Sequence, residues 1–317
     1  MKNKLISIVL PLHNEEGNIN ELYQRLIRTL NTEKKYDFEI IFVNDGSIDS
    51  SLKLVKDLSL RDNRVKYISL SRNFGHQAAL TAGLTYAKGD AIIMIDADLQ
   101  HPPELITELI TCWEDGYQVV YTVRDETKDI SFFKKITANI FYRLINLVSQ
   151  VKIDPNSSDF RLIDSKICDI IRQNPERERF YRGLIPWIGF RQKSIRFCAD
   201  SRFSGKTSYT LSKMLRFAIS GILSFSFVPL LVIIGLSIFL AIASIIYILF
   251  VFYQKFISGQ AIPGQASVLI AILIIGSVQL LAISITAIYS YKTYHEAKRR
   301  PIYIVDETKG FNDEPKS

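Results

Sequence analysis

The first half of the chain alternates short apolar runs with stretches in which apolar residues recur every three or four positions. The apolar runs are rich in β-branched residues and predict buried strands, whereas the periodic stretches predict helices. The expected strands are Leu5–Leu10, Phe38–Val43, Val65–Leu70, Ala91–Ile95 and Gln118–Val123. The expected helices are about Asn18–Asn31, Ser50–Leu60, His76–Ala87 and Glu104–Glu114. Strands that alternate with helices predict an α/β fold with a mostly parallel sheet.

Beyond these elements the pattern changes twice before the chain becomes strongly hydrophobic. The stretch Ser131–Val148 has an apolar side and a basic side, which suits either a helix packed on the core or one lying in a membrane interface. We leave both readings open. The stretch Asp154–Leu162 is expected to place an acidic residue in a loop next to an apolar strand.

Charged residues are absent from Phe217–Gln254 and from Ile257–Tyr291. Each run exceeds the ~20 apolar residues that cross a bilayer, so the chain is expected to be an integral membrane protein. Because Pro229 suits the first turn of a helix, it divides the first run. The expected organisation is a soluble domain at 1–208, an interfacial helix at 209–228, membrane spans at 229–253 and 266–291, and a tail at 292–317.

The distribution of charge predicts the orientation of these segments. Between Arg172 and Arg216 there are eleven Lys or Arg and three acidic residues, a larger surplus than the net +7 of the 317-residue chain. Basic residues also follow the second span, whereas the loop between the spans has only Lys255. The positive-inside rule therefore places the soluble domain and both termini in the cytoplasm.

Other features of the composition agree with an anchored cytoplasmic domain in the cell (inner) membrane. The start of the chain lacks the pattern of a signal peptide, and its three cysteines, which are far apart, are expected to be reduced. No nucleic-acid recognition motif accompanies the basic residues, so anionic lipid is the favoured partner of that charge.

Two carboxylates and an amide follow the strand expected at Ala91–Ile95. If the segment stays extended, Asp96, Asp98 and Gln100 share one face, and their oxygen atoms suit a hard divalent cation that also holds phosphate. The alternative is a loop whose aspartates cap the next helix. A dinucleotide-binding oxidoreductase is disfavoured because the first turn lacks the G-x-G-x-x-G pattern.

Several short motifs occur together in this order. They are Pro11-Leu12-His13-Asn14-Glu15, Asn44-Asp45-Gly46-Ser47, Arg72-Asn73-Phe74-Gly75, Asp96-Ala97-Asp98-Leu99-Gln100 and Gly183-Leu184-Ile185-Pro186-Trp187-Ile188-Gly189-Phe190-Arg191. With these motifs the chain resembles the family 2 glycosyltransferases of GT-A fold. Within them it is most similar to the polyprenyl-phosphate glycosyltransferases, the bacterial relatives of dolichol-phosphate mannose synthase. The resemblance extends over nearly the whole chain, including the paired hydrophobic segments.

The resemblance implies a role for particular residues. Those implied for the nucleotide-sugar site are Pro11, Asn14, Glu15, Asp45 and Asp96. Those implied to hold Mg²⁺ or Mn²⁺ are Asp96, Asp98 and Gln100. Those implied to hold the acceptor phosphate are Arg124, Arg202 and Lys206, with Lys134 and Arg143 as weaker candidates. Three positions depart from the family pattern and affect base and ribose recognition: His13, Asn44 and His101.

Asp159 and Asp98 are the catalytic candidates. Asp159 matches the acidic position of the family's Asp-Phe-Arg-Leu motif, which the resemblance implies is a catalytic base. On physical grounds Asp159 could instead orient a sugar hydroxyl or Arg161. Since a lipid phosphate is already ionised near neutral pH, it needs cations more than it needs a base.

The expected reaction is the metal-dependent transfer of one hexose, glucose by general resemblance, from a UDP-sugar to undecaprenyl phosphate, with inversion. Mannose, galactose, 4-amino-4-deoxy-arabinose and N-acetylated sugars stay open. A processive polysaccharide synthase is disfavoured because the chain lacks Gln-x-x-Arg-Trp. A non-catalytic membrane scaffold is the alternative outside the enzymes. A homo-oligomer, a flippase and a downstream glycosyltransferase are the expected protein partners.

Overall fold

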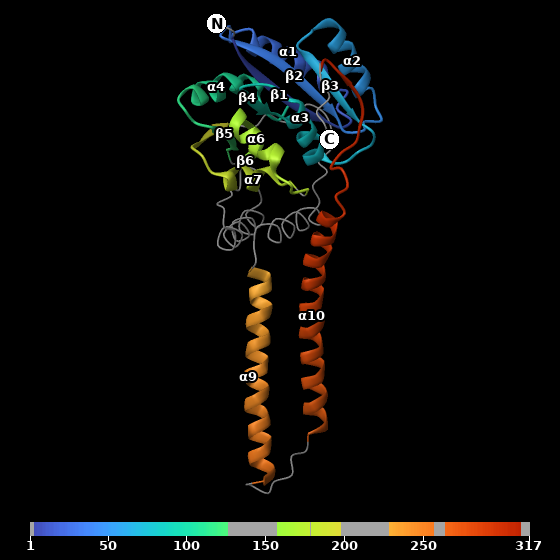
Figure 1. Ribbon diagram of the computed structural model, residues 1–317, viewed down its shortest axis with the longest axis vertical. Coiled ribbons are helices and arrows are strands. Elements are labelled where there is room, and N and C mark those ends of the chain that lie inside the picture. Colours follow the sequence, from blue (N-terminus) through green and yellow to red (C-terminus); the bar gives the residue numbers. More distant parts are fainter. Residues whose placement is uncertain (1–2, 126–156, 178, 198–227, 257–263, 312–317) are drawn as a thin grey trace. The chain divides into compact units, whose positions relative to one another are not determined.

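The structure is a computed structural model that describes residues 3–125, 157–177, 179–197, 228–256 and 264–311. The chain divides into two compact units (Figure 1). The first contains the described residues up to 197 and those from 300 to 311. The second contains the described residues 228–256 and 264–299, which form two long helices.

The first unit is built on one eight-stranded sheet with the order β7-β5-β6-β4-β1-β2-β3-β8. In chain order the strands are β1 (Lys4–Leu12), β2 (Tyr36–Asn44), β3 (Val65–Leu70), β4 (Ala91–Met94), β5 (Val119–Arg124), β6 (Ser157–Asp164), β7 (Gln192–Phe197) and β8 (Val305–Lys309). Strand β1 pairs in parallel with β2 and β4, β2 with β3, and β5 with β7. Strands β6 and β8 run antiparallel to their neighbours. The α/β fold with a mostly parallel sheet is therefore confirmed.

Helices cover both faces of the sheet. They are α1 (Ile19–Leu30), α2 (Ser51–Arg61), α3 (His76–Tyr86), the 3₁₀ turn η1 (Pro103–Leu105), α4 (Ile106–Glu114), α6 (Ser165–Gln173) and α7 (Tyr181–Ile188). Alternate residues of β1 point to opposite faces, so Ile8 joins the core cluster that contains α1, α2 and α4, and Val9 joins the cluster that contains α3, α6 and α7. The result is a sheet buried on both sides.

The elements expected from Leu5 to Val123 form within a few residues of their predicted bounds. Two differences concern the later part of the chain. Asp159, which lies in a stretch expected to put an acidic residue in a loop, is inside β6, and residues expected in the tail form β8. Cys112 and Cys168 are free and buried, and Cys198 lies outside the described residues.

The second unit contains α9 (Val228–Phe256) and α10 (Gln265–Ala297). Pro229 lies in the first turn of α9, as expected. Within the described residues, one segment, Ile274–Ala297 of α10, is long and apolar enough to cross a membrane, and a shorter apolar stretch, Ile233–Tyr247, lies within α9. The predicted helix at 131–148 lies outside the described residues, as does the predicted interfacial helix at 209–228 except for Val228, which begins α9.

Candidate active site

Four of the five motifs lie together at the end of the sheet where strands β1 to β4 finish. Strands β1, β2, β3 and β4 are parallel neighbours, so the turns that follow their carboxyl ends lie side by side. These turns carry the motifs that begin at Pro11, Asn44, Arg72 and Asp96. In open α/β sheets this edge is where ligands bind.

The turns after β1 and β2 are joined to each other by hydrogen bonds. The backbone N–H of Asn14 donates to Ser47 Oγ (3.0 Å), and Asn14 Oδ1 accepts from the N–H of Ile48 (2.9 Å). Asn14 has a φ of 59°, a conformation that Asn tolerates better than most residues. The N–H of Glu15 donates to Ser51 Oγ (2.8 Å). These hydrogen bonds therefore hold the two turns together. Pro11, which is buried, lies at the end of β1 just before the first of them.

Asp45 fixes the turn after β3 in the same way. Its buried carboxylate accepts hydrogen bonds from the N–H groups of Phe74 (2.7 Å) and Gly75 (2.9 Å). Gly46 allows this close approach, because a Cβ on it would lie 2.4 Å from the carbonyl carbon of Arg72. Asp45 thus has a structural role here in addition to the nucleotide contact that the resemblance implies.

The acidic segment after β4 turns instead of staying extended. Leu99 has a φ of 61°, and the N–H of Gln100 donates to Asp98 Oδ1 (3.1 Å). The expectation that strand alternation aligns the three oxygen-bearing side chains is therefore wrong. Gln100 Oε1 accepts a hydrogen bond from Arg124 Nη2 (3.1 Å), which ties the end of β5 to this turn.

Two histidines flank the carboxylate of Asp96. His76 Nε2 lies 3.4 Å from Asp96 Oδ1 and 3.7 Å from Asp159 Oδ2. His101 Nδ1 lies 3.6 Å from Asp96 Oδ2 and has no hydrogen-bond partner among the described residues. Burial lowers the pKa of His101, so its imidazole is neutral near pH 7. His76, at the start of α3, connects the acidic turn with β6.

Asp159 is held by arginines. Arg182, in the first turn of α7, donates from Nε to Oδ1 and from Nη2 to Oδ2, both at 3.0 Å. Arg161 Nη2 is 3.8 Å from Oδ1. Burial alone would raise the pKa of the Asp159 carboxyl, but the charge and hydrogen bonds of Arg182 outweigh it and hold that pKa well below its usual range. Burial also lowers the pKa of Arg161 to about 10, so this guanidinium remains charged.

The acidic turn suits a cation that is shared with a substrate. In the part of the chain that the structure describes, no group of three or more His, Cys, Asp or Glu is arranged to hold a metal. Mg²⁺ and Mn²⁺ are hard cations, and Mg²⁺ typically binds one or two carboxylates and completes its shell with substrate phosphates and water. Asp96 and Asp98 fit that arrangement, while the amide oxygen of Gln100 already accepts from Arg124.

Sequence reasoning missed His76 and Arg182 as site residues. Each adjoins a recognised motif: His76 follows Arg72–Gly75, and Arg182 precedes Gly183–Arg191. That adjacency was the signal available for finding them. The predicted phosphate-binding residues Arg202, Lys206 and Lys134, and the weaker candidate Arg143, lie outside the described residues.

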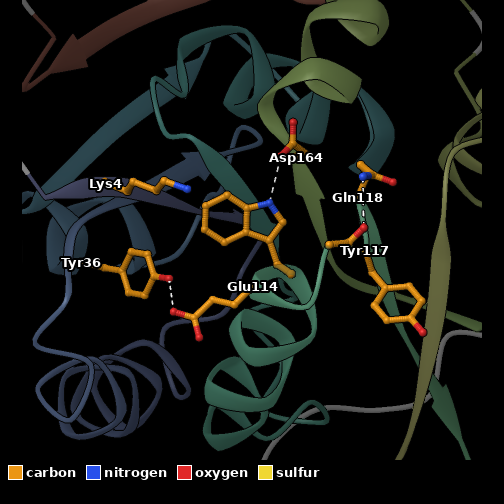
Figure 2. A pocket seen from close by; sticks show the side chains of 8 residues that line it. Lys4, Tyr36, Glu114, Tyr117, Gln118 and Asp164 are labelled. Atoms are coloured by element: carbon orange, nitrogen blue, oxygen red, sulfur yellow. Dashed lines mark hydrogen bonds between the residues drawn. The ribbon is translucent and has the colours of Figure 1, made fainter.

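A separate pocket lies at the opposite edge of the sheet (Figure 2). Its lining residues Lys4 and Tyr36 begin β1 and β2, so it is at the amino ends of the parallel strands. Lys4 Nζ lies 4.9 Å from the centre of the Trp113 ring, and Trp113 Nε1 donates to Asp164 Oδ2 (2.9 Å). The pocket is therefore at the end of the sheet opposite the acidic turn and is separate from the site described above.

Comparison with known proteins adds a family to this geometry. Residues 7–171 match the family model described as glycosyl transferase family 2. An uncharacterized glycosyltransferase, YkcC of Bacillus subtilis (strain 168), is 43% identical over 97% of this chain and 95% of its own length. The bactoprenol glucosyl transferase of Shigella phage SfV is 36% identical over 96% of this chain and 99% of its own.

Among solved structures, glucosyl-3-phosphoglycerate synthase from Mycobacterium tuberculosis, in complex with Mn²⁺, uridine-diphosphate-glucose and phosphoglyceric acid, is 17% identical. The match covers 70% of this chain and 79% of that chain, with a TM-score of 0.47. A score this low transfers no function to the present chain.

Proposed function

Because the chain belongs to glycosyl transferase family 2 and is a glycosyltransferase, we propose that it transfers one glucose from UDP-glucose to a polyprenyl phosphate. Undecaprenyl phosphate is the expected acceptor. The observation that carries the proposal is the pairing of the Asp96–Asp98 turn with the Asp159–Arg182 pair at one sheet edge, bridged by His76. The similarity to a bactoprenol glucosyl transferase over almost the whole chain supports the choice of glucose and of a lipid phosphate.

The proposed step is a direct displacement at the anomeric carbon. An oxygen of the lipid phosphate forms a bond to that carbon as the bond to the diphosphate of UDP breaks, so the configuration inverts and UDP leaves. The acceptor oxygen carries no proton near neutral pH, and the step therefore needs no general base. Asp96 and Asp98 would hold Mg²⁺ or Mn²⁺, which when bound neutralises charge on the departing diphosphate.

The arginines provide positive charge for the acceptor in this proposal. Asp159 fixes the orientation of the Arg182 guanidinium through two parallel hydrogen bonds, a geometry that is both strong and directional. Arg124 is held by Gln100, and its Nε is buried without a hydrogen-bond partner among the described residues. We assign Arg182 and Arg124 to the acceptor phosphate, and Asp159 to the positioning of Arg182.

The C-terminal strand supports two membrane crossings. Strand β8 follows α10 in sequence, yet it pairs with β3 in the same sheet that holds β1 to β7. A chain that leaves a domain, crosses a membrane and returns to the same domain must cross an even number of times. Since α10 is long and apolar enough to cross, we propose that α9 crosses as well, with both termini and the catalytic domain in the cytoplasm.

A homo-oligomer, a flippase and a downstream glycosyltransferase remain proposals that rest on the sequence alone. The hypothesis of a non-catalytic scaffold predicts that the acidic turn has no part in any reaction. The transferase hypothesis predicts that Asp96 and Asp98 are needed for turnover.

An assay of sugar transfer in membranes tests the proposed function. Membranes that contain the full-length chain are incubated with Mn²⁺, a polyprenyl phosphate and one labelled donor at a time, from a panel of UDP- and GDP-sugars. We expect label from UDP-glucose in the chloroform phase, and loss of at least ~100-fold of the rate in Asp98→Asn. Full activity of Asp98→Asn, or no lipid product from any donor, would sink the proposal. Asp57→Asn, on α2, is the matched control.

A further inference from the structure

We propose that the end of α7 lies in the head-group layer of an anionic bilayer, inserting Trp187 and Phe190 among the lipids. We call Trp187, Phe190 and Arg191 the α7 tip. It belongs to the first unit of the chain and is separate from α9 and α10 in sequence. The catalytic domain would therefore have a membrane contact of its own.

The first observation is exposure of two large aromatic side chains. Trp187 is 57% exposed and Phe190 is 49% exposed. The inner face of the same helix is packed, since Tyr181, Leu184 and Ile185 are buried in the core cluster that contains α3 and α6. The helix therefore has the support it needs without the two aromatics, and their contact with water is unfavourable.

The second observation is that the fold holds this turn in a strained conformation. Gly189 and Phe190 both have positive φ, 87° and 69°, and for a bulky residue such as Phe this is a genuine outlier. Hydrogen bonds fix the turn: Gln192 Nε2 donates to the carbonyl of Gly189 (3.2 Å), and the N–H of Arg191 donates to Gln118 Oε1 (3.1 Å). Strain that is retained in this way is typical of functional sites.

The third observation is charge, which selects the partner. Between Tyr181 and Phe197 there are four Lys or Arg and no Asp or Glu. The tip residue Arg191 and its neighbour Lys193 both lie over the ring of Tyr117, at 5.0 and 5.1 Å from its centre. Aromatic side chains with neighbouring cations are the pattern that binds the interface of an anionic membrane.

The location of the tip gives it a consequence for the reaction, which rests on the proposed function. Arg182 is in the first turn of α7 and the tip is at its end, so a helix of about 12 Å separates them. Because Arg191 contacts Gln118, which lines the pocket at the amino ends of the parallel strands, a tip at head-group depth would hold Arg182 about one helix length from the head groups. The helix would then set the distance between the catalytic edge and the membrane surface.

Depth-dependent fluorescence quenching tests this placement directly, because the chain contains two tryptophans. The full-length Trp113→Phe variant, which retains Trp187, is reconstituted in phosphatidylglycerol-containing nanodiscs with a nitroxide on the lipid head group. We expect emission from Trp187 to fall clearly relative to unlabelled discs, because an interfacial aromatic lies at the depth of the head groups. The Trp187→Phe variant, which reports Trp113, should be quenched far less.

Equal quenching of the two variants, or no quenching of Trp187, would overturn the proposal. The latter is also the outcome if another protein segment covers the tip. The unsubstituted chain is the control for misfolding of Trp113→Phe. Its emission comes from both tryptophans, so we expect the part from Trp187 to be quenched and the part from Trp113 to be largely retained. The measurement does not depend on catalysis. An enzyme without activity but with a quenched Trp187 would contradict the proposed function and still support the membrane contact of the α7 tip.

Discussion

At the residue scale, the pairing of Asp159 with Arg182 limits what Asp159 can do. A general base works best when its pKa lies near the working pH. Arg182 moves the pKa of Asp159 in the opposite direction, and its two hydrogen bonds occupy both carboxylate oxygens. An ionised acceptor phosphate does not require proton removal. A positioning role for Asp159 therefore agrees with its surroundings better than a role as base.

Substitution of each partner tests that role. We predict that Asp159→Asn, which retains one acceptor oxygen, and Arg182→Lys, which retains the charge but loses the planar fork, each lower kcat/KM at least about tenfold. Steady-state kinetics with UDP-glucose and a polyprenyl phosphate provide the measurement.

Asp169→Asn is the control, because Asp169 forms an ion pair with Arg172 at the surface of α6, away from the site. It should leave kcat/KM unchanged. Wild-type kinetics in Arg182→Ala would contradict the positioning role, since Asp159 would then act without the group that it is proposed to orient.

Of the residues in this pair, Asp159 could be predicted as a site residue from the sequence and Arg182 could not. Asp159 was identifiable because it belongs to a short motif. Its partner Arg182 is 23 residues away, and what brings them together is the packing of α7 against β6. Similarly, alternation along an extended segment could not predict the turn at Leu99, because a left-handed residue interrupts it. Local patterns located the site, and tertiary contacts decided its geometry.

At the scale of elements, the buried parallel strands were predictable and the edge strands were not. Strands β1 to β4 are apolar runs because both faces of the sheet are covered. The two edges, β7 and β8, are short and rich in charged residues, as edge strands often are. The position of β8 depends on pairing with β3 and on contacts such as the ion pair of Glu307 with Lys56 (2.5 Å).

The close packing of α3 on the central strands β1 and β2 can be tested by a substitution in α3. Gly83 of α3 faces the sheet, and a Cβ there would lie 2.2 Å from Val9 Cγ1 and 3.1 Å from Val43 Cγ2. Because both neighbours belong to central strands, we predict that Gly83→Ala lowers the free energy of unfolding by about 1–3 kcal/mol. Thermal unfolding of the purified protein gives the measurement.

Gly276→Ala is the control for this prediction. Among the described residues, nothing lies within 4 Å of the added methyl group on α10, and Ala favours the helix. Its melting temperature should be equal to or above that of the wild type. If Gly83→Ala also melts no lower, α3 does not pack on the sheet as the structure shows.

At the scale of the whole molecule, the pairing of β8 in the sheet supports the proposed membrane topology. The sheet needs residues from both ends of the chain, so the segment between them must return to the side from which it left. The sequence predicted two spans from charge-free length, and the sheet gives an independent reason for an even number. Within the expected tail, Val305–Lys309 are thus part of the sheet of the first unit.

Cysteine labelling tests this topology in intact cells. In a background in which Cys112, Cys168 and Cys198 are replaced by Ser, single cysteines are introduced as Gly259→Cys, between the two spans, and Asp306→Cys, in β8. We predict that a membrane-impermeant maleimide labels the first from outside and the second only after permeabilisation. Labelling of both from the same side would refute the two-span hairpin.

The identity of the products tests the central claim most directly. The purified full-length enzyme is incubated with UDP-glucose, undecaprenyl phosphate and Mn²⁺, and the lipid and nucleotide products are analysed by mass spectrometry. We predict a lipid that gains one hexose and no second phosphate, together with one UDP released for each lipid formed. Release of UMP with a lipid diphosphate, or UDP release without a glycosylated lipid, would contradict the displacement proposed here.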